Sequence, residues 1–92
     1  MALLNTEDIS LKLPDLWTYD EAAKMIWREF QLGNFLDAIA FMNMVAPLAE
    51  MQDHHPDLFL HSYNKVKVIL SSHDKGGVTD RDIKLATEIN AL

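Results

Sequence analysis

The stretch FLDAIAFMNMVAPLAEM, residues 35–51, decides the fold of this 92-residue chain. It lacks glycine and is rich in Ala, Leu and Met, so we expect a helix of roughly four to five turns. At 100° per residue the helix presents two apolar faces, one with Ala38, Phe41, Met42, Val45 and Ala49, and the other with Leu36, Ala40, Met44, Pro47 and Met51. One face can pack on a sheet of the same chain, and we expect the other to need a second subunit. Partial exposure of the Met side chains is the alternative.

The segments before this helix predict a short helix and two strands. Asn5 or Thr6 is suited to cap a helix that Pro14 ends. Residues 17–19 read as a short strand, residues 20–23 as a turn, and residues 24–31 as a second strand, because aromatic and β-branched residues alternate there. Gly33 and Asn34 then form a turn.

The segments after the helix predict one or two strands and a last helix. Residues 57–61 read as extended, and residues 63–72 as a strand with Val66, Val68 and Leu70 facing inward. After a turn at residues 73–77, Thr79 and Asp82 resemble a capping box that opens a helix with an apolar stripe of Leu85, Ile89 and Leu92. Residues 1–92 therefore form a single α+β domain, with an antiparallel sheet and helices on one face.

Composition excludes several classes of function. Eight basic against fourteen acidic residues give a net charge of −6, which argues against a nucleic-acid surface. No cysteine is present, so neither disulfides nor a thiolate metal site is expected, and a reducing cytosol suits the chain. The N-terminal residues do not resemble a signal peptide, and Asp37, Asn43 and Pro47 interrupt the longest apolar run. We expect a cytoplasmic protein that does not span a membrane.

Within the predicted helix at residues 35–51, Pro47 removes one backbone hydrogen bond and should bend the helix.

The sequence EMQDHHP, residues 50–56, brings two adjacent histidines together at the end of the long helix. Pro56 disfavours helical geometry at His55, so the helix should stop there. Glu50 precedes His54 by four residues, which would place carboxylate and imidazole together on a last helical turn. Such a partner fixes the ring tautomer and raises its basicity, as a general acid or base requires. The alternative is that both are ordinary surface histidines.

His73 follows the predicted strand and could meet His54 and His55 in space, which suggests an acid/base site. In isolation, His73 would be a loop histidine and Asp82 a helix cap. A metal site built from the three histidines and a carboxylate is a weaker alternative, because adjacent histidines in an extended segment point apart and no HExxH spacing is present. No serine or cysteine has the context of a nucleophile.

Five elements of this pattern resemble a known family signature: Glu50, His54-His55-Pro56, Tyr63, His73 and Asp82, separated by three, six, nine and eight residues. Their spacing is similar to the signature of pterin-4a-carbinolamine dehydratases, and the similarity runs from about Lys24 to Leu92. The resemblance implies a four-stranded antiparallel sheet with three helices on one side. It also implies a homodimer or homotetramer, which would cover the second apolar helix face.

The activity implied by the resemblance is that of a hydro-lyase. It removes water from 4a-hydroxytetrahydropterin to give quinonoid dihydropterin, which recycles the cofactor of aromatic amino acid hydroxylases. The substrate would be a small pterin molecule, and neither a metal nor a redox cofactor is implied, because the reaction is an elimination.

Site roles also follow from the resemblance. His54 and His73 would be the proton-transfer pair, and His55 would orient the pterin together with Pro56 and Ser72. Glu50 would hold His54, and Asp82 would hold His73 or shape its loop.

Two features depart from the family pattern. The first helix is short, and Pro47 lies in the long helix that would form the subunit interface, so the choice between a dimer and a tetramer stays open. The alternative function is an assembly or accessory role without required turnover, because animal members of the family act as dimerisation partners of a homeodomain transcription factor. Leu36, Met44 and Met51 would supply that surface.

Overall fold

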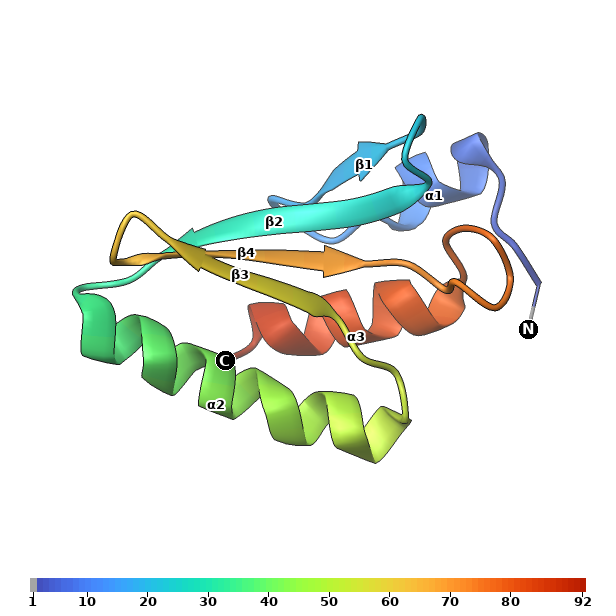
Figure 1. Cartoon of the computed structure of the whole chain (residues 1–92). Coiled ribbons are helices and arrows are strands. Elements are labelled where there is room, and N and C mark those ends of the chain that lie inside the picture. The colour runs from blue at the N-terminus through green and yellow to red at the C-terminus, as the bar shows by residue number, and fades with distance from the viewer. Residues whose placement is uncertain (1) are drawn as a thin grey trace.

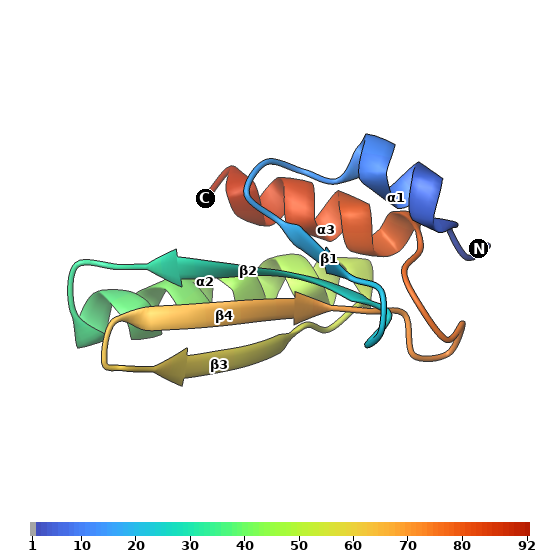
Figure 2. The same cartoon turned by 90° about the horizontal axis from the view of Figure 1, so that it is seen from above.

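The computed structural model describes residues 2–92 as three helices and one four-stranded sheet. In chain order these are α1 (Thr6–Lys12), β1 (Thr18–Asp20), β2 (Met25–Gln31), α2 (Phe35–Gln52), β3 (Asp57–His61), β4 (Lys65–Leu70) and α3 (Asp80–Asn90). All strand pairs are antiparallel, and the strand order is β1-β2-β4-β3 (Figure 2). Helices α2 and α3 lie against one face of the sheet (Figure 1), and the end of α1 contacts the start of α3 through an ion pair between Lys12 and Asp80. The predicted α+β class is confirmed.

The core follows the alternation read from the sequence. Val66, Val68 and Leu70 of β4 are fully buried, whereas Lys65 and Lys67 lie on the opposite face of the sheet. The inner face of α2 and the stripe of α3 complete the core with Ala38, Phe41, Val45, Ala49, Leu85, Ala86 and Ile89. The expectation that Leu92 joins this stripe is wrong, because α3 ends at Asn90 and Leu92 is 45% exposed.

The long helix ends earlier than Pro56 alone would require. Gln52 is its last residue, and Asp53 adopts a left-handed conformation with φ of 47°. The backbone N–H of His54 then bonds the carbonyl of Ala49 at 3.1 Å, which closes the helix end. The chain therefore leaves the helical path before His54. Upstream, α2 is continuous through Pro47, an exposed residue.

The last two strands are joined by a tight turn where the sequence predicts strand. Ser62 and Tyr63 have φ of 50° and 57°, and the N–H of Asn64 bonds the carbonyl of Ser62 at 2.8 Å. Consequently β4 begins at Lys65 rather than Tyr63. It ends at Leu70, and Ser72 pairs only with Gly77 in an isolated bridge. Likewise β1 begins one residue later than predicted, at Thr18.

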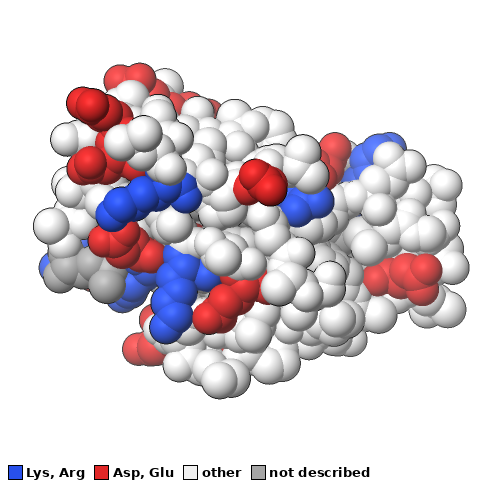
Figure 3. Space-filling view, turned by 180° about the vertical axis from the view of Figure 1, so that it is seen from behind, with Lys and Arg blue, Asp and Glu red and all other residues white. Residues whose placement is uncertain are grey.

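The second apolar face of α2 is not covered within the single chain. Leu36, Met44 and Met51 are 76%, 49% and 84% exposed. On the side of the molecule seen in Figure 3, acidic and basic side chains are interspersed without a continuous basic patch. Among residues 2–92, no helix combines the length and the apolar character needed to cross a bilayer.

Replacing Leu85 with alanine tests the packing of α3 on the core. Leu85 is fully buried, so Leu85→Ala should lower the free energy of unfolding by about 2–5 kcal/mol. The matched control is Leu11→Ala in α1, where the leucine is 81% exposed, and it should change stability by less than about 0.5 kcal/mol. Urea denaturation followed by circular dichroism measures both. Equal effects of the two substitutions would contradict this packing.

Candidate active site

The three predicted site histidines line one open pocket. Its volume is about 330 Å³, and its lining consists of Asp53, His54, His55, Ser71, His73, Asp74 and Arg81. A second hollow of about 240 Å³ is lined by Ala23, Lys24, Met25, Asp57, Ile69, Ser71, His73 and Gly76. Ser71 and His73 line both, so the two hollows adjoin. Together they fall within the size range of small-molecule sites.

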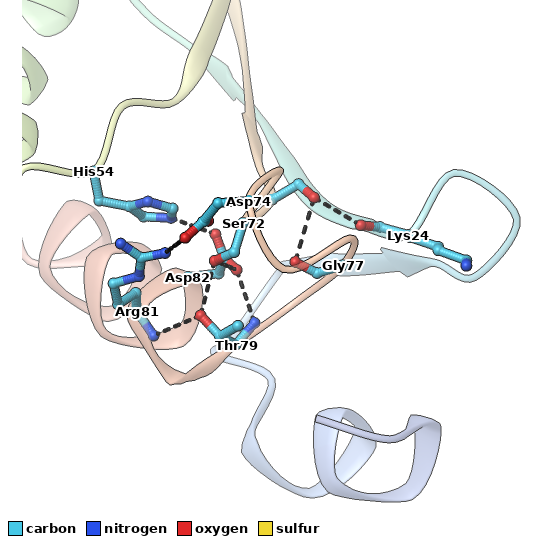
Figure 4. Close-up of polar contacts among 9 residues, drawn as sticks. Lys24, His54, Ser72, Asp74, Gly77, Thr79, Arg81 and Asp82 are labelled. Carbon is cyan, nitrogen blue, oxygen red and sulfur yellow. Dashed lines mark hydrogen bonds and ion pairs between the residues drawn. The ribbon is translucent and has the colours of Figure 1, made fainter. Parts of the chain in front are cut away.

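His54 is anchored by a buried carboxylate from the start of α3. Its ring is 7% exposed, and its Nε2 lies 2.5 Å from Oδ1 of Asp82, which is fully buried (Figure 4). The other oxygen, Oδ2, accepts the backbone N–H of Thr79 and the hydroxyl of Ser72, both at 2.9 Å. Asp82 also lies in the first turn of α3, where the helix dipole favours negative charge. These donors allow a carboxylate to be buried without an orphaned lone pair.

This arrangement fixes the tautomer of His54. The hydroxyl of Ser72 and the N–H of Thr79 donate to Oδ2 of Asp82, and a carboxylate also accepts at Oδ1, so we infer that Nε2 of His54 carries the hydrogen. Nδ1 has no hydrogen-bond partner among residues 2–92. Among the described residues, the one side-chain nitrogen that is both fully buried and unpaired is Nε of Arg81. Nδ1 of His54, which is also unpaired, therefore keeps some contact with solvent. In this tautomer Nδ1 is the unprotonated nitrogen of a ring that lines the pocket.

Each of the two carboxylates contacts a different histidine from the one predicted. Glu50 binds His55, with Oε1 and Nε2 2.6 Å apart, and both side chains are exposed. The predicted contact between Glu50 and His54 is wrong because the chain leaves the helical path at Asp53. Of the two roles expected for Asp82, a contact with His73 is not found, because its Oδ1 lies against His54, whereas it does meet the loop of His73 through the hydroxyl of Ser72.

His73 lies exposed in the loop between β4 and α3. The N–H of Ser72 bonds the carbonyl of Gly77 at 2.7 Å and closes the loop, and Gly76 supplies the left-handed residue with φ of 79°. Asp74 is held by Arg81, whose Nη2 lies 2.9 and 3.2 Å from the two carboxylate oxygens (Figure 4). The residues on both sides of His73 are therefore tethered, which restricts where its ring can move.

Four pocket residues were not predicted from the sequence: Asp53, Ser71, Asp74 and Arg81. The sequence signal for two of them was their position next to predicted site residues, since Asp74 follows His73 and Arg81 precedes Asp82. Conversely, neither Pro56 nor Glu50 is among the lining residues. Ser72 is 1% exposed and lies beneath the pocket, where its hydroxyl binds Asp82. Within residues 2–92, no three His or carboxylate side chains converge so that they could hold a metal ion.

The sequence matches a family model across almost its whole length. Residues 2–92 match the family described as pterin 4 alpha carbinolamine dehydratase. A Prochlorococcus marinus protein that carries this family name is 51% identical over 76 residues, which cover 83% of this chain and 77% of that protein. The pterin-4-alpha-carbinolamine dehydratase of Drosophila melanogaster is 43% identical over 90 residues, which cover 94% of this chain and 46% of that protein.

Solved structures show the same fold. The transcriptional coactivator/pterin dehydratase of Brucella melitensis matches with a TM-score of 0.89 and 38% identity, covering 96% of this chain and 95% of that one. A pterin dehydratase-like protein, described as a RuBisCO assembly factor in the alpha-carboxysome, matches with a TM-score of 0.67 and 21% identity, covering 82% and 86%. At that identity the second likeness concerns the fold alone. By sequence and by structure, the chain belongs to the pterin-4a-carbinolamine dehydratase family.

Proposed function

We propose that this chain dehydrates 4a-hydroxytetrahydropterin to quinonoid dihydropterin, recycling the pterin cofactor of aromatic amino acid hydroxylases. The observation that carries the proposal is the pocket shared by His54, His55 and His73, with His54 bound from below by buried Asp82. Two imidazoles near one pocket, one fixed and one exposed, supply the two proton transfers that an elimination of water needs.

In the proposed mechanism His54 is the base and His73 the acid. Nδ1 of His54 takes the proton from the ring nitrogen next to the hydroxylated carbon, and a C=N double bond forms as the C–O bond breaks. His73 gives its proton to the departing hydroxyl, which leaves as water. Asp82 stabilises the imidazolium that His54 becomes. After the product leaves, His54 loses this proton to solvent and the exposed ring of His73 regains one from solvent. His55, held by Glu50, orients the pterin.

The adjoining hollow suits the substrate's bicyclic ring. Its lining includes the apolar side chains of Met25 and Ile69 from neighbouring strands β2 and β4, next to His73. Charged groups of Lys24 and Asp57 border the same hollow and could meet the polar edge of a pterin. A ring lying there would bring its reactive carbon near His73 and the pocket of His54. The reaction would take place in the cytoplasm.

The alternative is an accessory role without required pterin turnover. The Brucella relative is described as both coactivator and dehydratase, and the carboxysome protein as an assembly factor. The dehydratase proposal is favoured because His54, His55, His73 and Asp82 are all present and their geometry serves proton transfer, which a purely structural role does not need.

Activity on freshly made 4a-hydroxytetrahydropterin tests the function. The wild-type protein should accelerate water loss measured by ultraviolet absorbance. Exposed His73→Ala should lower kcat by about 10²-fold or more, and His54→Ala with His73→Ala should abolish the acceleration. A wild type no faster than the double variant would refute the enzyme proposal. Loss of activity with a chelator and recovery with zinc would instead support the metal alternative.

The buried carboxylate should matter more than the exposed one. Asp82→Asn should lower kcat by about 10²-fold, because an amide can turn its NH₂ toward His54 and favour the wrong tautomer. Glu50→Gln should lower it by less than about tenfold, because the Glu50–His55 pair is solvent-exposed. Asp80→Asn, the same change two residues away at an exposed position of α3, is the control. Steady-state kinetics rank the three, and Glu50→Gln as the most damaging change would contradict the proposed roles.

We also propose that the protein is a homodimer or homotetramer in which a second copy covers the outer face of α2. Replacing Met44 and Met51 with lysine should then reduce the mass measured by light scattering, because charges would have to be buried. Leu11→Lys, at an exposed leucine of α1, should leave the mass unchanged. A wild type that runs as a monomer would refute the proposal.

A further inference from the structure

We propose that Ser72 is a positioning residue that acts through Asp82 on His54, and that with Thr79 it sets the direction of every proton around that carboxylate. The inference rests on the proposed function, since it concerns how the base of the reaction is prepared. It also departs from the expectation that Ser72 contacts the substrate.

Three buried polar side chains form a continuous network beneath the pocket. Ser72, Thr79 and Asp82 are 1%, 0% and 0% exposed. The Ser72 hydroxyl lies 2.8 Å from the Thr79 hydroxyl and 2.9 Å from Oδ2 of Asp82 (Figure 4). These groups come from the loop after β4 and from the start of α3, and the network reaches His54 after α2.

Counting protons gives this network a single direction. Ser72 has one O–H, and Asp82 as an acceptor takes it. The hydroxyl of Thr79 must therefore donate to the oxygen of Ser72. The oxygen of Thr79 accepts the backbone N–H of Arg81 at 3.3 Å. The chain of donors thus runs through Thr79 and Ser72 to Oδ2 of Asp82. The other carboxylate oxygen, Oδ1, has Nε2 of His54 as its partner.

Helix capping accounts for part of this network but not for Ser72. Thr79 and Asp82 form the capping box of α3, a common stabilising feature. Ser72 lies outside that helix, ten residues before Asp82, and no cap requires its hydroxyl. Its contact places a further donor on the carboxylate that binds the proposed base.

Ser72 also links His54 to His73 through its backbone. Its carbonyl accepts the N–H groups of Lys75 and Gly76 at 2.9 and 3.0 Å, and its own N–H bonds Gly77, so Ser72 is the hub of the loop that carries His73. One residue therefore anchors both proposed proton-transfer groups, with its side chain toward His54 and its backbone around His73.

The tautomer of His54 is the first test, and it requires no activity. In the ¹⁵N-labelled wild type at alkaline pH, where the ring is neutral, long-range proton–nitrogen spectra should show Nε2 protonated and Nδ1 unprotonated. In Ser72→Ala the two nitrogen signals should move toward each other as the tautomers begin to exchange. The control Ser10→Ala, at an exposed position of α1, should leave the two nitrogen signals unchanged. A protonated Nδ1 in the wild type, or no change in a folded Ser72→Ala protein, would overturn the inference.

A double-mutant cycle with Asp82→Asn is the second test. Ser72→Ala should lower kcat about tenfold in the wild type but less than about twofold in Asp82→Asn, because residues in one hydrogen-bond network are not additive. Equal losses in both backgrounds would mean that Ser72 acts independently of Asp82, and would overturn the inference. A wild type that dehydrates no substrate refutes the proposed function instead, whereas the tautomer measurement still decides the role of Ser72.

Should Ser72→Ala fail to fold, a comparison of Thr79→Val with Thr79→Ser serves the same purpose. The serine variant is expected to retain the wild-type tautomer and rate.

Discussion

The burial of Asp82 is the constraint on which the site depends. A carboxylate without solvent contact is stable only if its oxygens are filled by donors, and here those donors come from three parts of the chain. The segment after α2 supplies His54, the loop after β4 supplies Ser72, and the N-cap of α3 supplies the N–H of Thr79. Meeting the hydrogen-bond needs of one buried group therefore fixes the relative positions of the segments that form the pocket.

This constraint divides the histidines into different physical classes. His54 is buried and bound to a buried carboxylate, so its orientation is set by the core. His55, although adjacent in sequence, points to solvent with exposed Glu50. His73 is exposed on a loop whose ends are fixed by Ser72 and by the Asp74–Arg81 pair. His54 and His55 line the same pocket, but they differ in burial and in the carboxylate that each contacts, which is why they are assigned different roles.

The same architecture leaves one apolar surface uncovered in the single chain. The outer stripe of α2 is apolar and exposed, while its inner stripe is in the core. A helix with two apolar faces gains burial free energy when another molecule covers the second face, at roughly 25 cal/mol per Å² of apolar area. The candidate site lies between the segment after α2, the loop after β4 and α3, and the three histidines that line its pocket come from one chain.

The sequence by itself indicated an α+β order of helices and strands, with one or two strands left open after the long helix, together with the two faces of α2 and caps at Asn5 or Thr6 and at Thr79. These follow from short-range rules, namely side-chain periodicity, cap chemistry and turn residues, which act within a few positions of the chain. The candidate site residues Glu50, His54, His55, His73 and Asp82 came instead from the resemblance of their spacing to a family signature. Which carboxylate binds which histidine was decided only by the tertiary structure. Glu50 was expected to reach His54 along a helix, but the left-handed Asp53 redirects the chain. Asp82 reaches His54 across 28 positions because the sheet and α3 bring their segments together, and no local pattern encodes that distance.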